Sequence, residues 1–153
     1  MTAECETQHT NVRPIILDND KLLLLDQRKI PEAVEYVDAT SLESMFAAIR
    51  DMIVRGAPAI GVAAALSLAL EAKRIIAQGV GNRPDFLKQL NQAKERLQSS
   101  RPTAVNLRWA TEYVFELAEK SNELSDKKLA EFLLESAHAL IEKDIMINKS
   151  IGD

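Results

Sequence analysis

Two apolar segments of helical periodicity meet at one charged turn, Val54-Arg55-Gly56-Ala57-Pro58-Ala59-Ile60-Gly61. Pro58 suits the first turn of a helix, because the backbone N–H that proline lacks would have no intrahelical partner there. Gly56 can adopt a positive φ or let a ligand approach the backbone closely. Unpaired N–H groups at a helix start attract anions, and Arg55 lies beside them. The turn therefore predicts an anion-binding helix start.

The segments on either side of this turn are both predicted to be helices. Before it, apolar residues recur at helical spacing at Met45, Ile49, Met52 and Ile53, which predicts a helix over residues 41–54. After it, residues 62–70 are almost wholly apolar and rich in Ala, which predicts a helix that continues to about Gln78. The apolar stretch is shorter than the about 20 residues that cross a bilayer, so we read it as a buried helix.

The sequence before residue 40 is typical of a small antiparallel sheet. Apolar runs on either side of Asp18-Asn19-Asp20 predict a β-hairpin over residues 13–27. Alternation of apolar and polar residues predicts a third strand over residues 34–37. Thr40 followed by Glu43 resembles a capping box, which would begin the first helix.

Three further amphipathic helices are predicted after Gln78. The first covers residues 85–98, the second follows a cap at Thr103, and the last follows a cap at Ser125. Trp109 and Tyr113 are four residues apart on the second of these helices. Because such a pair lies on one helix face, we expect both rings to pack in the core.

Together these elements predict an α+β fold that is mainly α, with a small N-terminal antiparallel sheet followed by a bundle of about five helices. We expect a polar tail at residues 1–12, a β subdomain at residues 13–39 and a helical domain at residues 40–153. The chain has 153 residues, of which 46% are hydrophobic and 27% charged, as in a soluble globular protein.

Charge and cysteine content exclude several classes of protein. The net charge of −4, with no basic stripe, argues against nucleic-acid binding. Cys5 is the single cysteine and cannot form an internal disulfide, and residues 1–13 lack the apolar core of a signal peptide. We therefore expect a cytoplasmic protein that binds no membrane. His138 and His9 have no second ligand at metal spacing, so we expect no metal site.

Two arginines precede predicted helix starts that contain proline. Arg55 lies before Pro58, and Arg101 lies before Pro102. If the two helices pack side by side, both guanidinium groups and both helix starts could hold one phosphate or phosphorylated sugar, because guanidinium binds phosphate oxygens in a bidentate manner. The alternative is that both arginines are solvated or pair with neighbouring acids. Asn106 could face the same ligand or bond locally.

The acidic residues give no pair suited to proton transfer. Asp18, Asp20 and Asp26 are read as turn or hairpin-edge residues, and Glu142 and Asp144 lie near a helix end. Residue spacing alone therefore supplies no base, no nucleophile and no metal ligand set.

Three motifs, in chain order, resemble those of the methylthioribose-1-phosphate isomerases. Residues 52–65, Met-Ile-Val-Arg-Gly-Ala-Pro-Ala-Ile-Gly-Val-Ala-Ala-Ala, resemble the N-terminal signature of that family. Residues 100–107, Ser-Arg-Pro-Thr-Ala-Val-Asn-Leu, resemble its second signature. Leu25-Asp26-Gln27 with Ile30-Pro31 is similar to its opening hairpin. The resemblance covers nearly the whole chain from about residue 13.

This resemblance implies an isomerase of methionine salvage that converts methylthioribose 1-phosphate to methylthioribulose 1-phosphate without a cofactor. It implies substrate contacts at Arg55, Gly56, Ala57 and Arg101, which would position and neutralise the phosphate. Family members are longer and carry a catalytic Cys and Asp in a second, Rossmann-like domain, and residues 148–153 resemble the helix end before that domain. We therefore expect no catalytic residue in this chain, and no activity without that domain or a companion chain.

Two other functions are compatible with the resemblance. The wider group includes regulatory subunits of initiation factor two-B, which would make this chain a non-catalytic binding module. It also includes ribose-1,5-bisphosphate isomerases, which would change only the substrate. The paired signatures around Arg55 and Arg101 favour the methylthioribose-1-phosphate enzyme, which we expect to be a homodimer.

Overall fold

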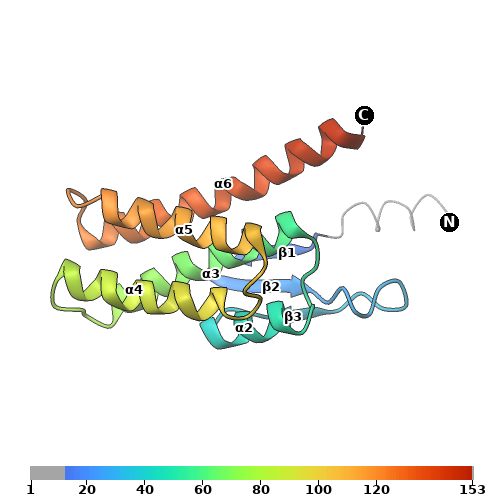
Figure 1. Cartoon of the computed structure of the whole chain (residues 1–153), viewed down its shortest axis with the longest axis horizontal. Coiled ribbons are helices and arrows are strands. Elements are labelled where there is room, and N and C mark those ends of the chain that lie inside the picture. Colours follow the sequence, from blue (N-terminus) through green and yellow to red (C-terminus); the bar gives the residue numbers. More distant parts are fainter. Residues whose placement is uncertain (1–12, 153) are drawn as a thin grey trace.

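The computed structural model describes the backbone of residues 13–152 and the side chains of residues 13–141. In this part of the chain a three-stranded sheet is followed by five helices (Figure 1). The strands are β1 (Ile15–Asp18), β2 (Lys21–Leu25) and β3 (Tyr36–Asp38), and the helices are α2 (Leu42–Arg50), α3 (Ala57–Ala77), α4 (Arg83–Gln98), α5 (Val105–Lys120) and α6 (Asp126–Gly152). The predicted α+β, mainly α fold is confirmed.

The sheet has the order β1-β2-β3, and both strand pairs are antiparallel. Asp18 pairs with Lys21, so Asn19 and Asp20 form a two-residue turn. Both turn residues have a positive φ, 49° and 67°, as a type I′ hairpin turn requires. The predicted hairpin is confirmed, because the residues that its turn demands are readable from the sequence.

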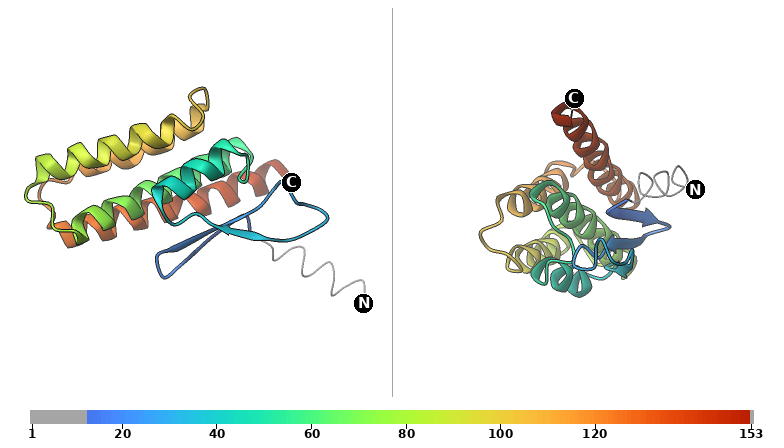
Figure 2. Two further views of the ribbon diagram at one scale, coloured as in Figure 1. Left: turned by 90° about the horizontal axis from the view of Figure 1, so that it is seen from below. Right: turned by 90° about the vertical axis from the view of Figure 1, so that its right-hand side faces the viewer.

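One face of the sheet belongs to the hydrophobic core that the helices share. Leu22 and Leu24 of β2 have no exposed surface and join the same cluster as the buried side chains of α2 and α3. The left view of Figure 2 shows the strands lying across α2 and α3. The predicted third strand is confirmed, although it begins at Tyr36.

The cap of α2 differs from the prediction. Ser41, not Thr40, is the N-cap, and its Oγ accepts a hydrogen bond from the N–H of Ser44 at 3.1 Å. Thr40 serves the sheet instead, because its Oγ1 accepts a hydrogen bond from the N–H of Leu22 at 3.0 Å. A long-range contact therefore decides which of two neighbouring hydroxyls caps the helix.

The end of α2 also differs, since the helix stops at Arg50, earlier than predicted. Met52 has a φ of 63°. The N–H of Ile53 donates to the carbonyl of Ala48 at 2.9 Å, and the N–H of Met52 donates to that of Ile49 at 3.3 Å. These are the bonds of a Schellman motif, in which the residue after the C-cap takes the left-handed conformation.

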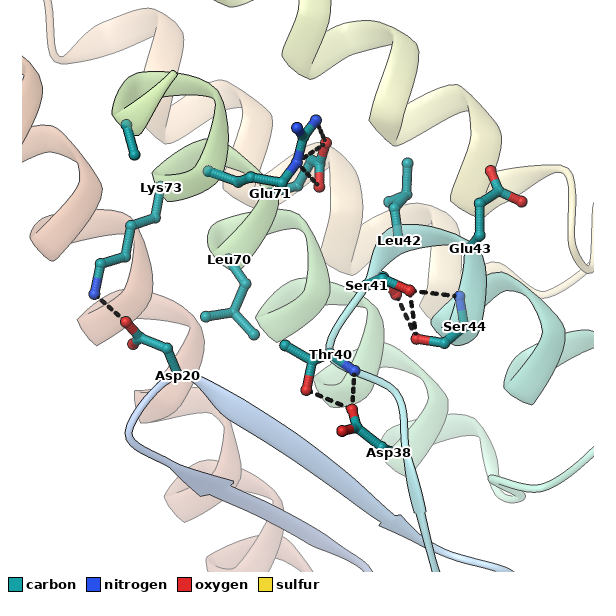
Figure 3. Close-up of a pocket in the computed structure, with 12 residues that line it drawn as sticks. Asp20, Asp38, Thr40, Ser41, Leu42, Glu43, Ser44, Leu70, Glu71 and Lys73 are labelled. Carbon is teal, nitrogen blue, oxygen red and sulfur yellow. Dashed lines mark hydrogen bonds and ion pairs between the residues drawn. The ribbon is translucent and has the colours of Figure 1, made fainter. Parts of the chain in front are cut away.

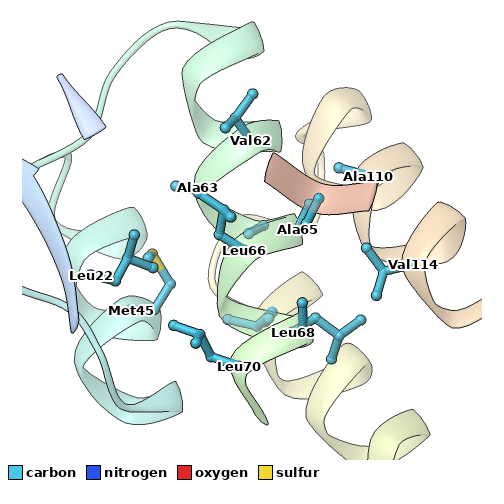
Figure 4. Close-up of a cluster of buried hydrophobic side chains, with 14 of the residues drawn as sticks. Leu22, Met45, Val62, Ala63, Ala65, Leu66, Leu68, Leu70, Ala110 and Val114 are labelled. Atoms are coloured by element: carbon cyan, nitrogen blue, oxygen red, sulfur yellow. The ribbon is translucent and has the colours of Figure 1, made fainter. Parts of the chain in front are cut away.

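α3 is the central helix of the fold. Every residue from Ile60 to Ala72 is buried, and α2, α4, α5 and α6 all pack against it (Figures 2 and 4). Its C-cap is Gln78, where the sequence predicted the helix to end. Among the helices of the described chain, none is both long and apolar enough to cross a membrane.

Two predicted helix starts are displaced. α4 begins at Arg83 rather than Asp85, because Asn82 is its N-cap and accepts a hydrogen bond from the N–H of Asp85 at 2.9 Å. Thr103 does not cap α5, whose N-cap is Ala104 and which has no side-chain cap. The first turn of α5 therefore keeps its backbone N–H groups unpaired.

The prediction that Trp109 packs in the core is wrong. Its side chain is 56% exposed and stacks on Tyr113, with ring centroids 5.4 Å apart and planes at 2°. α5 buries Leu107, Ala110 and Val114 instead. Because these three residues face α3, position 109 points away from it, while the ring of Tyr113 packs partly against the core.

Asp26 directly follows β2, at the hairpin edge as predicted, and it is a buried structural residue. It is 1% exposed and accepts hydrogen bonds from Arg28 N at 3.0 Å, Nε at 2.9 Å and Nη2 at 2.9 Å. The bond from the Arg28 side chain is the main cause that lowers the pKa of Asp26. Next to it, the N–H of Gln27 donates to the carbonyl of Ile53 at 2.9 Å. The hairpin end thus supports the turn that precedes α3.

Candidate functional site

The turn before α3 and the loop before α5 enclose a cavity of about 350 Å³. α3 and α5 pack against each other and begin at the same end of the bundle, on the right in Figure 1. Gly56 and Ala57 line the cavity from the start of α3, and Arg101 and Asn106 line it from the start of α5. Residues far apart in the sequence are therefore brought to one site, because α3 and α5 pack side by side. This packing was the condition on which the prediction of a shared site depended.

These two helix starts are unlike the others in the described chain. Neither α3 nor α5 has a side-chain cap or an acidic residue in its first turn. The other three helices have both, with the pairs Ser41 and Glu43 for α2, Asn82 and Asp85 for α4, and, as predicted for the cap, Ser125 and Asp126 for α6. The positive ends of α3 and α5 are therefore left free to attract an anion.

The backbone conformation at position 56 requires glycine. Its φ is 89° and its ψ is 130°, a region that residues with a side chain rarely adopt. A Cβ added there would meet nothing within 4 Å, so the constraint is conformational and not steric. Of the two roles that the sequence left open for Gly56, the structure shows the positive φ.

Gly61 sets the approach of α5 to α3. A Cβ on Gly61 would lie 3.2 Å from the carbonyl oxygen of Asn106 and 3.6 Å from Cβ of Ala110. Such a contact is close to the limit that packed atoms tolerate. Glycine therefore lets the first turn of α5 lie directly against α3, which draws Asn106 and the loop before it to the cavity.

The two predicted arginines occupy different positions. Arg101 lines the cavity and is half-buried, whereas Arg55 is exposed and does not line it. Neither guanidinium has an acidic partner within 4.0 Å among residues 13–141, unlike Arg28, Arg74 and Arg96. In the described chain, neither arginine therefore forms the ion pair with a neighbouring acid that was the alternative prediction. Both charges are available to a ligand.

The lining also includes Asn106, for which the sequence left ligand contact and a local bond open, and Met52, which was not predicted as a site residue. Asn106 lies in the first turn of α5, and its side chain makes no hydrogen bond to the described residues, although a local bond was the alternative reading. Met52 also lines the cavity and is 43% exposed. Its left-handed backbone could not be foreseen, because the sequence has methionine where such a turn favours glycine.

A larger hollow of about 920 Å³ lies between the hairpin tip, the start of α2 and the second half of α3 (Figure 3). Both of its cations are paired with acids, Lys73 with Asp20 and Arg74 with Glu71, and its Glu43 pairs with Arg96 of α4. Asp38 accepts hydrogen bonds from N and Oγ1 of Thr40 at 2.9 and 2.6 Å, and these bonds lower its pKa. This hollow therefore presents no unpaired cation to an anionic ligand, in contrast to the smaller cavity.

The smaller cavity has positive charge suited to an anion but no lining group suited to proton transfer. Arg101 is the only titratable side chain among its lining residues, and a guanidinium stays protonated. Among the described residues, no three histidines, cysteines or acids cluster as metal ligands would, and His138 is exposed on α6. Cys5, His9 and the side chains of Glu142 and Asp144 lie outside the described residues.

Comparison with known proteins gives one family and several relatives. Residues 53–153 match the initiation factor 2 subunit family. The chain is 39% identical over 139 residues to a methylthioribose-1-phosphate isomerase of Desulforamulus reducens, with 91% of this chain and 39% of the relative covered. It is 42% identical over 136 residues to a 5-deoxyribose 1-phosphate isomerase of Clostridium botulinum, with 89% of this chain and 38% of the relative covered.

Two solved structures share the fold. The 5-methylthioribose 1-phosphate isomerase of Pyrococcus horikoshii superimposes with a TM-score of 0.77 at 31% identity, with 86% of this chain and 36% of that chain covered. Subunit delta of translation initiation factor eIF-2B from A. fulgidus superimposes with a TM-score of 0.77 at 34% identity, with 88% and 38% covered. The chain thus spans less than two fifths of the length of each of these relatives.

Proposed function

The chain belongs to the initiation factor 2 subunit family, and from this premise we propose that it forms the sugar-phosphate-binding, N-terminal part of an aldose–ketose isomerase. The reaction is the interconversion of methylthioribose 1-phosphate and methylthioribulose 1-phosphate, a step of methionine salvage that uses no cofactor. The names of the two curated relatives support this class, because both substrates are ribose 1-phosphates without a hydroxyl at C5.

The observation that carries the proposal is the meeting of two uncapped helix starts with an unpaired arginine at one cavity. The N–H groups at Ala57 and Asn106 would donate to phosphate oxygens, as N–H groups at helix starts do in other phosphate sites. Arg101 would add a bidentate, charge-assisted contact, and Arg55 would add positive charge at the rim. Gly56 would let the ligand come close to the backbone.

The work of these groups is binding and orientation. A phosphate held at one end fixes the sugar, which lowers the entropic part of the barrier, and the guanidinium neutralises its charge. Since Arg101 is the only titratable group in the cavity lining, the acid and base that move the proton must come from elsewhere in the complete site. We therefore propose that the 153-residue chain binds the sugar phosphate without converting it, until it meets a catalytic domain or a companion chain.

A non-catalytic regulatory module is the second candidate. The archaeal eIF-2B subunit delta matches the fold as well as the isomerase does, with the same TM-score of 0.77. In that case the cavity would bind a phosphorylated ligand as a signal and no partner would restore turnover. A ribose-1,5-bisphosphate isomerase would use the same phosphate contacts with a different sugar. A homodimer stays a prediction of the family resemblance, and a cytoplasmic location stays a prediction from the cysteine content and the N-terminal sequence.

Calorimetric titration of the 153-residue chain with methylthioribose 1-phosphate, followed by an assay for the ketose, tests the proposal. We expect binding without turnover, weakened about tenfold or more by Arg101→Ala, because a bidentate charged contact contributes about 1.5–3 kcal/mol. Arg55→Ala should weaken binding less, since its side chain does not line the cavity.

Lys88→Ala is the matched control, because it removes the same charge from an exposed position on α4. It should leave the affinity unchanged. No binding by the wild-type chain, or equal weakening by Arg101→Ala and Lys88→Ala, would contradict the proposed site. Turnover by the chain alone would contradict the claim that it lacks the proton-transfer groups.

A further inference from the structure

Met52 has a backbone conformation that is unfavourable for a residue with a long side chain. It follows the C-cap of α2 in the left-handed conformation, with a φ of 63°, at the position of a Schellman motif where glycine is the usual residue. The other described residues besides glycine with a positive φ are Asn19 and Asp20, residue types that tolerate it. Met52 is therefore the one long apolar residue in a strained turn among residues 13–152.

The side chain of Met52 is not part of the hydrophobic core. It is 43% exposed, although apolar, and it lines the cavity next to the two helix starts. Neither backbone preference nor solvation favours methionine at this position. Backbone strain is often retained at functional sites, and a strained residue that lines a cavity fits this pattern.

The cavity is lined by both polar and apolar groups. Arg101 and the N–H groups of the two helix starts supply the polar groups, and Met52, Ile60 and Val105 supply apolar side chains. Val105 is 76% exposed, so this apolar surface is open to a ligand. A volume of about 350 Å³ is far larger than a phosphate group, so most of it must receive the rest of the ligand.

We propose that Met52 is a specificity-determining residue, whose thioether side chain packs against the apolar C5 end of the sugar phosphate while Arg101 and the helix starts hold the phosphate. This inference rests on the proposed function. A flexible, polarisable methionine side chain fits a methyl or methylthio group without demanding one shape. A hydroxyl or a second phosphate at C5 would lose its hydration against this surface without gaining a partner.

The test is a titration of the chain, followed by NMR, with three probes: methylthioribose 1-phosphate, ribose 1-phosphate and inorganic phosphate. The wild-type chain should prefer the methylthio sugar to ribose 1-phosphate by about tenfold or more, the size typical of one apolar group in a pocket. Met52→Gly should reduce this preference about fivefold and leave the affinity for inorganic phosphate within about twofold. Met52→Leu should keep the preference within about threefold.

Thermal unfolding of Met52→Gly separates a binding role from a structural one. Because glycine suits the left-handed turn, the variant should unfold at the same temperature as the wild type or higher. If the wild-type chain binds the sugar phosphates and Met52→Gly keeps the same preference, the specificity role is overturned and the phosphate site stands. If the wild-type chain binds none of the three probes, the proposed function is overturned and the role of Met52 falls with it.

Discussion

Gly56→Ala separates backbone conformation from space at the start of α3. The added methyl would meet no atom within 4 Å, so no clash contributes to its effect. At a φ of 89° and a ψ of 130°, however, a residue with a Cβ is strained by about 1–3 kcal/mol. Alanine also lowers the conformational entropy of the unfolded chain, which offsets this strain by about 0.4–1 kcal/mol. We therefore expect a loss of about 1–2 kcal/mol in the free energy of unfolding.

The same substitution should weaken sugar-phosphate binding, because Gly56 lines the cavity and relief of its backbone strain would shift the first N–H groups of α3. Urea denaturation gives the stability, and calorimetry with methylthioribose 1-phosphate gives the affinity, which should fall about tenfold. Gly79→Ala is the matched control: its φ is 81°, its Cβ would also meet nothing within 4 Å, and it follows the far end of α3. Unchanged affinity in Gly56→Ala, or equal losses in the two variants, would refute the reasoning.

Three further predictions concern the surroundings of the site. The lowered pKa of Asp26 means that its carboxylate stabilises the fold above its ordinary pKa near 4 and loses this effect as the pH falls through the lowered value. Asp26→Asn should therefore cost about 1–3 kcal/mol at pH 7 in urea denaturation and progressively less below pH 4; a constant difference across this range would exclude the mechanism. Gly61→Val should push the first turn of α5 outward and weaken phosphate binding more than Gly61→Ala, measured by the same calorimetry, because the alanine Cβ already lies 3.2 Å from Asn106 O; equal affinities would rule this out. Trp109 is the single tryptophan, and at 56% exposure its fluorescence should be quenched by acrylamide in the folded chain nearly as well as in urea, whereas strong protection would place it in an interface.

Features that depend on a few neighbouring residues could be read from the sequence. The hairpin follows from apolar runs around an Asn-Asp turn that tolerates positive φ at both positions. The conformation of Gly56 follows from its place between two helices and before Pro58. In each case the residue type tolerates the positive φ that the turn needs, so the prediction depends only on a few neighbouring residues.

Features set by distant contacts could not be read from it. Thr40 and Ser41 are equally suited to cap α2, and only the N–H of Leu22 on the neighbouring strand decides between them. Trp109 and Tyr113 lie on one helix face in any prediction, but the packing of α5 on α3 decides how exposed that face is. Each outcome depends on how elements pack, which local patterns do not encode.

The candidate site also combines residues that could be predicted from the sequence with one that could not. Residue spacing brought Arg55, Arg101 and the two helix starts together only on the condition that the two helices pack side by side, and the close approach at Gly61 meets this condition. The family resemblance added Gly56 and Ala57, which line the same cavity as Arg101. Met52 was assigned to the preceding helix because its apolar spacing continues that of Met45 and Ile49. The Schellman bonds that end α2 turn it to the cavity instead, and no glycine announces them.

The central claim is that one phosphate is held between the starts of α3 and α5. The most direct measurement is a ¹H–¹⁵N spectrum of the chain during titration with methylthioribose 1-phosphate. We expect the largest amide shifts at Gly56, Ala57 and Asn106, and their loss in Arg101→Ala. Shifts confined to the residues around Lys73 in the larger hollow, or no shifts at saturating ligand, would contradict it.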